Sequence, residues 1–160
     1  MAIVLADDEL YAFIGGAAPT VAELRERYRR QAAGRSDDGT ETWHNWIVRR
    51  RADDRAVGTV QATITDDGRT AEIAWVIGLA WQRQGYAGEA AAGLVDWLER
   101  RGVHIVTAHI HAEHAASAGV AARAGLVPTG SVEDGERVFR SVLGRSQAAE
   151  EPAKADDQPD

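Results

Sequence analysis

The sequence has no cysteine, one methionine and two phenylalanines among its 160 residues. The lack of cysteine excludes disulfide bonds, thiolate nucleophiles and cysteine-ligated zinc. No apolar run approaches the roughly 20 residues that a membrane-spanning helix needs. A signal peptide is not expected either, because residues 1–5 are followed at once by Asp7 and Asp8. These absences predict a cytoplasmic protein that does not enter a membrane.

The net charge of −7 is unevenly distributed. Residues 146–160 hold five acidic residues and one lysine, which gives −4 and leaves about −3 for the other residues. This acidic stretch contains proline and no aromatic residue, a composition typical of disorder. The nearly neutral remainder lacks the basic surface of nucleic-acid binders. We therefore expect one domain at residues 1–145, a disordered acidic tail at 146–160, and no nucleic-acid partner.

Residue periodicity predicts an α+β domain around a mostly antiparallel sheet. Thr20 and Glu23 form the capping box of a helix, and Asp-Asp-Gly at residues 66–68 is a hairpin turn signal. Helices are expected at residues 7–14, 20–31, 87–100 and 114–124. Strands are expected at residues 43–50, 57–65, 70–77, 103–110 and 136–143.

The segment most informative about function is a turn at residues 82–88, Gln-Arg-Gln-Gly-Tyr-Ala-Gly, between a strand and a helix. Unpaired N–H groups and the positive end of the helix dipole point at one spot there, which makes an anion site. Small residues at Gly85, Ala87 and Gly88 would let a diphosphate approach the backbone. The turn is not a Walker loop, because no Gly-Lys-Ser/Thr follows.

Gln82-x-x-Gly85-x-Ala87 resembles the Q/R-x-x-G-x-G/A motif of the GNAT N-acetyltransferases, in which the motif holds the pyrophosphate of acetyl-CoA. Its flanking segments are similar to the RimJ/RimL-like branch, and His114-x-x-Ser117 with the following Leu126 is similar to the family's N-x-x-S…L-G-F segment. The resemblance covers roughly residues 7–143. It implies a GNAT fold, a mostly antiparallel central sheet flanked by helices. The family usually begins with an earlier strand, so that first strand is dispensable here or the chain is truncated.

The same resemblance implies an acetyl-CoA-dependent N-acetyltransferase, in which a primary amine attacks the thioester directly. The acceptor would be a protein N-terminus or a small-molecule amine, and no metal or covalent enzyme intermediate is implied. The enzyme would be a monomer or a homodimer. The residues expected to bind acetyl-CoA are Val76, Ile77, Gln82, Arg83, Gln84, Gly85, Tyr86, Ala87, Gly88 and Ser117.

Acetyl transfer requires a base, since a lysine amine has a pKa of ~10.4 and an α-amine ~8. Glu72 is the preferred catalytic base because its strand leads into the cofactor turn, and His111 is the alternative. A backbone N–H near Val76 or Ile77 would stabilise the oxyanion. Ser117 would donate a hydrogen bond to the leaving thiolate, the alternative being a bond to its own helix backbone.

Two other functions stay open. The family's last-motif Asn is His114 here, and the Tyr often used as its acid falls at Ala121, which is compatible with a degenerate GNAT-fold module that binds acyl-CoA without turnover. The run at residues 109–114, H-x-H-x-E-H, is close to a zinc motif of metallo-hydrolases and makes a His-ligated metallo-hydrolase the third candidate.

Two further groups of side chains, the arginine run and two tryptophans, complete the expectations. The arginine run at residues 49–51 is expected to be a solvated turn at the end of the sheet away from the cofactor. Trp46 and Trp81 are expected in the core, with an acceptor pocket as the alternative. The identity of the acceptor amine does not follow from the sequence.

Overall fold

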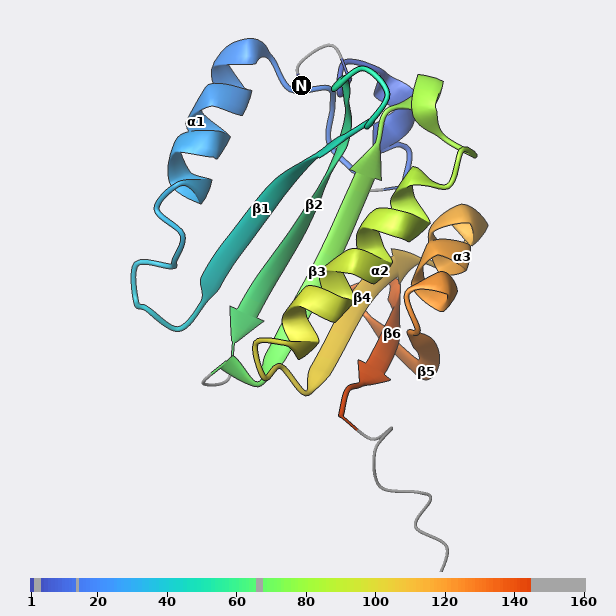
Figure 1. The fold of residues 1–160 in the computed structure, drawn as a ribbon. Helices are drawn as coiled ribbons and strands as arrows, with labels where there is room; N and C mark the ends of the chain where they lie inside the picture. The colour runs from blue at the N-terminus through green and yellow to red at the C-terminus, as the bar shows by residue number, and fades with distance from the viewer. Residues whose placement is uncertain (2–3, 14, 66–67, 145–160) are drawn as a thin grey trace, which may run out of the picture.

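The computed structural model describes residues 1, 4–13, 15–65 and 68–144. This part of the chain forms two 3-10 helices, three α-helices and six strands. Figure 1 shows how the labelled helices and strands are arranged. In chain order they are η1 (Asp8–Tyr11), α1 (Val21–Gln31), β1 (Thr42–Arg49), β2 (Ala56–Thr65), β3 (Thr70–Ile77), η3 (Leu79–Trp81), α2 (Tyr86–Glu99), β4 (Ile105–His111), α3 (Ala115–Arg123), β5 (Val127–Glu133) and β6 (Glu136–Val142). None of the described helices is long and apolar enough to cross a membrane.

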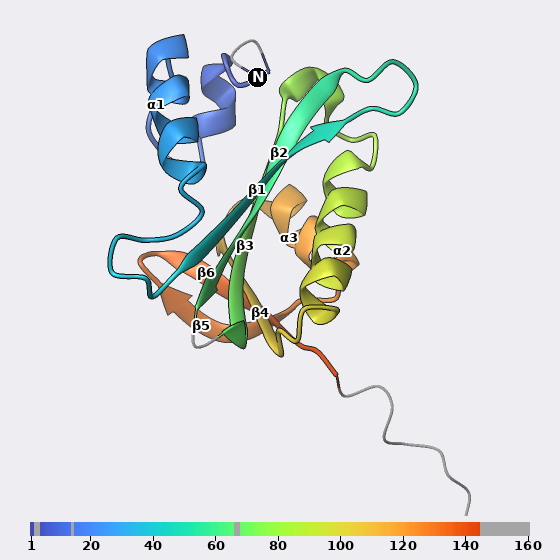
Figure 2. The ribbon, with the colours of Figure 1, turned by 60° about the vertical axis from the view of Figure 1, so that its left-hand side comes forward.

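The described strands form one mixed sheet in the order β1-β2-β3-β4-β6-β5. Among them, β3 and β4 run parallel and every other neighbouring pair is antiparallel. One face of the sheet carries α1, and the other carries α2 and α3 (Figure 2). This architecture confirms the α+β prediction with a mostly antiparallel sheet. Within the described residues, β1 is the first strand and lies at an edge of the sheet.

Two elements differ from the sequence-based prediction. The helix expected at residues 7–14 is a single 3-10 turn, Asp8–Tyr11, and Ile14 lies outside the described residues. A sixth strand, β5, was not predicted. All seven of its residues are exposed, and its pairing with β6 is interrupted between Pro128 and Val132. An exposed edge strand with this composition has no buried alternation that a sequence pattern could detect.

Residues 66 and 67 of the expected turn lie outside the described residues, and the whole tail at 146–160 does too. The single-domain assignment for residues 1–145 therefore stays a prediction. The capping box is confirmed: the backbone N–H of Thr20 donates to Glu23, and the backbone N–H of Glu23 donates to the Thr20 hydroxyl.

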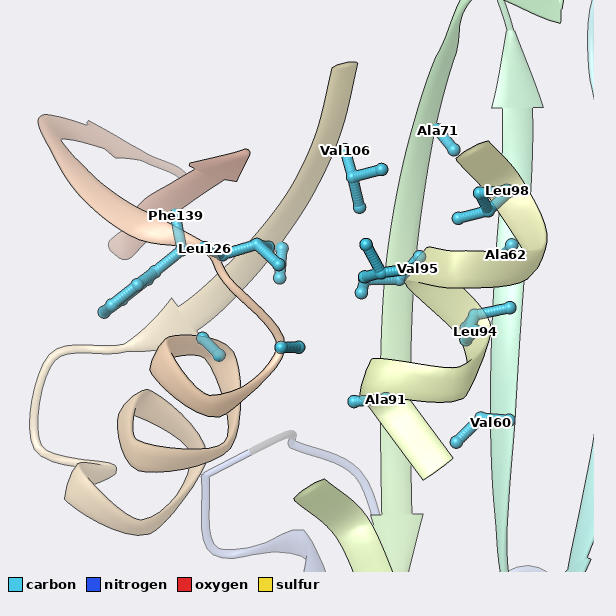
Figure 3. Packing of buried hydrophobic residues seen from close by; sticks show 14 of the residues in the cluster. Val60, Ala62, Ala71, Ala91, Leu94, Val95, Leu98, Val106, Leu126 and Phe139 are labelled. Carbon is cyan, nitrogen blue, oxygen red and sulfur yellow. The ribbon is translucent and has the colours of Figure 1, made fainter. Parts of the chain in front are cut away.

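The hydrophobic core lies between the sheet and helices α2 and α3 (Figure 3). Leu94, Val95 and Leu98 of α2 form the predicted apolar stripe and are buried. They pack against alternating strand residues such as Val60 and Val106. Burial of each such side chain contributes roughly 1.5–3 kcal/mol to stability. This packing holds α2, and therefore the turn before it, against the sheet.

Strands β3 and β4 pair over a short length and then separate. Thr70, Ala71 and Glu72 pair with Ile105, Val106 and Thr107, and the paired register ends there. Beyond it, β3 continues beside β2 and β4 continues beside β6. The sheet is therefore split between the carboxyl-terminal halves of its two parallel strands.

Candidate active site

The split between β3 and β4 contains a cavity of about 70 Å³. Residues 73–75 of β3 and 108–111 of β4 line it, together with Phe13, His114 and Ser117. Because β3 has no partner strand on this side, backbone groups along its open edge can hydrogen-bond to an extended ligand. The expected oxyanion donors at Val76 and Ile77 lie on the same strand, just beyond the cavity, so the structure keeps that assignment geometrically possible.

The turn that follows β3 presents unpaired backbone donors. Gly85 is the N-cap of α2 with φ 88°, and Arg83 also has a positive φ of 59°. The first backbone bond of the helix runs from the N–H of Glu89 to the carbonyl of Gly85 at 3.0 Å, and no side chain caps the helix. Therefore the backbone N–H groups of Tyr86, Ala87 and Gly88 have no acceptor among the described residues. Such a concave set of donors is suited to an anion.

Two glutamine side chains hold this turn in shape. Gln82 donates its Nε2 proton to the carbonyl of Ile77 at 3.1 Å, and Gln84 donates to the carbonyl of Ala80 at 3.1 Å. These amides are bonded to the protein's own backbone. Their contribution to the expected phosphate site is therefore to fix the positions of the N–H groups.

The arginine run at the end of β1 lies beside the turn at residues 82–88, so the prediction that it lies at the other end of the sheet was wrong. The Arg50 guanidinium is 4.7 Å from the centre of the Trp81 ring, and Trp81 packs edge-on against Tyr86 with ring centres 6.5 Å apart. Arg50 also pairs with Asp53. The physical reason is topological: β1 is antiparallel to β2 and β2 to β3, so β1 and β3 end on the same side.

Glu72, the preferred catalytic base, contacts a histidine that sequence reasoning did not assign to this role. The Oε1 atom of Glu72 is 3.4 Å from Nδ1 of His109, and Nε2 of His109 is 3.2 Å from Oε2 of Glu133. Burial lowers the pKa of His109, but the hydrogen bond to Glu133 and the charge of Glu72 outweigh it, so the pKa is raised above its ordinary value. The Glu72 side chain is 56% exposed and His109 is 22% exposed, which leaves the carboxylate accessible and the imidazole shielded.

Strand alternation contained the signal for this pair. Because side chains alternate between faces, His109 and His111 share the face of Thr107, which is the register partner of Glu72. His109 is the nearer of the two to that partner. In the sequence, His109 stands out only as part of the H-x-H-x-E-H run.

The alternative base, His111, lies farther along β4 in the lining of the cavity. Its Nδ1 accepts the backbone N–H of Glu113 at 3.2 Å, and its ring lies 5.4 Å from that of Phe13. The structure places Glu72 beside His109 and not beside His111.

The segment after β4 places Ser117 at the cavity. Nδ1 of His114 accepts the backbone N–H of Ser117 at 3.4 Å, so His114 caps α3 at the position where the family usually has Asn. Burial and the nearby His111 lower the pKa of His114, which favours the neutral acceptor form. The Ser117 hydroxyl makes no hydrogen bond to a described residue, so the expected alternative, a bond to its own helix, is not observed.

In the described part of the chain, the structure gathers no three histidine, aspartate or glutamate side chains into a possible metal site. His109 contacts Glu72 and Glu133, whereas His114 packs against Phe13 with ring centres 4.4 Å apart. The H-x-H-x-E-H run therefore divides between two environments. The described structure gives the metallo-hydrolase alternative no support.

A larger hollow of about 720 Å³ follows the edge strand β1. Its walls include Tyr28 of α1, Thr59 of β2 and Val76 of β3, so it reaches the strand that borders the split. Trp46 also lines this hollow, and its ring packs edge-on against that of Trp97 with ring centres 4.9 Å apart. Trp46 thus combines the core role and the pocket-lining role that the sequence left as alternatives.

Comparison with known proteins identifies the family. Residues 1–127 match the model of the acetyltransferase (GNAT) domain. Comparison with curated proteins gives no match.

Solved structures share the fold at low sequence identity. An acetyltransferase of the GNAT family from Bacillus anthracis aligns with a TM-score of 0.72 and 18% identity, over 89% of this chain and 86% of that chain. Spermidine N-acetyltransferase from Vibrio cholerae, in complex with CoA and spermine, aligns with a TM-score of 0.67 and 17% identity. That alignment covers 87% of this chain and 84% of the other. Aminoglycoside acetyltransferase AAC(6')-Ib, in complex with coenzyme A, aligns with a TM-score of 0.69 and 16% identity, over 89% of this chain and 87% of that chain.

These structures confirm the GNAT fold that the motif at the α2 turn implied. The family model spans residues 1–127 of 160, well over half of the sequence. The chain therefore belongs to the GNAT acetyltransferase domain family.

Proposed function

We propose that this protein is an N-acetyltransferase, which transfers the acetyl group of acetyl-CoA to a primary amine by direct attack. The observation that carries the proposal is the split between β3 and β4. It opens beside a helix start with unpaired N–H groups, and the Glu72–His109 pair lies next to it. A base near the start of β3, an open strand edge beyond it and a diphosphate site after the end of the strand thus follow one another along the split. The CoA complexes of the spermidine and aminoglycoside acetyltransferases support this choice of cosubstrate.

The cosubstrate would be held mainly by backbone groups. The N–H groups of residues 86–88 would bind the diphosphate, as their lack of internal acceptors favours. Arg83, in the same turn, and Arg50, beside it, would supply positive charge. The open edge of β3 up to Val76 and Ile77 would bind the extended arm and the thioester oxygen.

Glu72 acts as the base in this proposal, and His109 is a positioning residue behind it. The amine nitrogen forms a bond to the acetyl carbonyl carbon, the carbon–sulfur bond breaks, and the amine proton passes through water to Glu72. Nδ1 of a neutral His109 can then take that proton while its Nε2–H stays bonded to Glu133. Ser117 would donate a hydrogen bond to the departing sulfur, which takes a proton from solvent through water and leaves as CoA thiol, while His109 returns its proton to solvent.

The degenerate acyl-CoA-binding module remains the second candidate, because Ala121 is fully buried and the structure places no tyrosine there. The finer assignment to the RimJ/RimL-like branch, with a protein N-terminus as acceptor, also stays a prediction. The deciding experiment is a thiol-release assay with acetyl-CoA and a panel of peptide N-termini, amino acids, polyamines and aminoglycosides. Amine-dependent release of CoA thiol is expected. Binding of acetyl-CoA without release for any amine would favour the degenerate module.

A further inference from the structure

The hollow under α1 is a groove built from two adjoining cavities of about 720 and 250 Å³. We call this the α1 groove. Ligand sites commonly have volumes of about 300–1,000 Å³, so it can hold a small molecule. The two cavities share Arg27, Gln31, Trp43, Asn45 and Gln61 as wall residues.

The α1 groove leads to the proposed base. Its walls include Gln61 and Thr63 of β2. In the strand register, Gln61 pairs with Ala74 and Thr63 pairs with Glu72. Directly paired side chains lie on the same face of a sheet, so one end of the groove borders Glu72. A molecule in the groove can therefore present an amine to that carboxylate.

The charge of the α1 groove is positive. Among the described residues, its lining contains Arg27 and Arg30 of α1 and no aspartate or glutamate; Arg101 lines its far side, where it stacks on Trp97 of α2. Two carboxylates of α1 are engaged elsewhere, since Glu23 belongs to the capping box and Glu26 pairs with Arg29. The nearby carboxylates are Glu41, which accepts the indole N–H of Trp43, and Glu72 at one end of the groove. Along the rest of the groove a polycation would meet like charges, whereas an anionic group would be attracted.

A buried hydroxyl group independently indicates a polar ligand. The Tyr28 Oη atom is buried and has no hydrogen-bond partner among the described residues, and Tyr28 lines the groove. Burial raises the pKa of Tyr28, so its hydroxyl stays protonated and can donate. Buried polar groups are normally paired. A ligand oxygen would complete the bonding of this hydroxyl beside Arg27.

We infer that the acceptor is an amine that also carries a carboxylate and an apolar or aromatic body, as an aromatic amino acid does. Arg27 and the Tyr28 hydroxyl bind the carboxylate, and the body packs against Trp43. This inference rests on the proposed function. The products are the N-acetyl amino acid and CoA thiol, with the amine proton taken by the base. Such a substrate differs from the polyamine and aminoglycoside acceptors that are named for two proteins of the same fold.

Tryptophan and tryptamine test the inference, because they differ by the carboxylate alone. Calorimetric titration in the presence of CoA should show tryptophan binding at least tenfold more tightly than tryptamine, and spermidine more weakly still. Arg27→Gln should remove most of this preference, and Tyr28→Phe should reduce it. Arg25→Gln is the matched control, since Arg25 is an exposed arginine of the same helix outside the groove lining.

Thiol release with the same compounds separates the two levels of the proposal. Tryptophan binding that depends on Arg27, but without thiol release, would support the groove and contradict the proposed function. Acetylation of spermidine or tryptamine in preference to tryptophan would overturn the acceptor class and leave the acetyltransferase intact. Equal binding of tryptophan and tryptamine would also overturn it.

Discussion

At the residue scale, the chemistry of the proposed site depends on which side chain contacts Glu72. If Glu72 is the base, Glu72→Gln should reduce turnover by about 10²–10⁴-fold and leave acetyl-CoA affinity nearly unchanged. His111→Ala should cost much less, because His111 does not contact Glu72. Steady-state kinetics on a good acceptor, with calorimetry for acetyl-CoA, measures both effects. A larger loss in His111→Ala than in Glu72→Gln would reverse the assignment.

His109 provides a pH-dependent test of the same site. Its folded pKa is raised, so its protonated form stabilises the folded protein below an unfolded pKa of ~6.5. This contribution is lost as the pH rises through the folded pKa. The melting temperature of the unaltered protein should therefore exceed that of His109→Gln more at pH 5.5–6 than at pH 8–8.5. A difference that is independent of pH would show that His109 is not held between the two carboxylates.

The pH profile of turnover should change in the same variant. Glu72 can pass a proton only to a neutral His109, so activity should rise with an inflection above ~6.5. His109→Gln should shift or remove that inflection, whereas a merely structural role would lower activity equally at all pH values.

At the element scale, the turn before α2 should determine cosubstrate binding. Gly85→Glu would place a carboxylate beside the unpaired N–H groups and should abolish the rise in melting temperature that acetyl-CoA causes. Nothing lies within 4 Å of a Cβ at Gly85, but its positive φ strains any other residue. Gly85→Ala carries that strain without the charge and is therefore the control. Unchanged affinity in a folded Gly85→Glu protein would contradict the diphosphate site.

At the scale of the whole molecule, the two faces of the sheet have different roles. The face under α2 and α3 contains the apolar core and supports the turn before α2. The opposite face is more polar and carries Glu72, His109 and most of the α1 groove, which continues past the edge strand β1 to Trp97 of α2. The split between β3 and β4 connects the two faces. In the proposed enzyme, acetyl-CoA and the amine therefore approach the thioester from different sides of one sheet.

The acidic tail is expected to contribute little to this assembly. Residues 146–160 contain no periodic apolar face that could offset the entropy of ordering them. Removal of residues 146–160 should leave the melting temperature and turnover nearly unchanged. Differential scanning calorimetry of the shortened chain tests this expectation. A loss of several degrees would mean that the tail packs on the rest of the protein.

The sequence by itself determined the features that depend on neighbours a few residues away. The capping box of α1, the apolar stripe of α2 and the glycine-containing turn before it were all predictable. Short spacings set which backbone and side-chain groups meet in a helix or a turn. The antiparallel strands were also predictable, because alternation and turn signals mark them locally.

The tertiary structure alone decided which distant residues meet. Glu72 and Glu133 contact the two nitrogens of His109 only because β3, β4 and the unpredicted β5 take their places in one sheet. The same strand order brings Arg50 beside Trp81 and the turn before α2, and the packing of α1 on the sheet forms the groove around Tyr28. These contacts depend on strand register and on the separation of β3 from β4. Neither property is encoded in the spacing of residues along one segment.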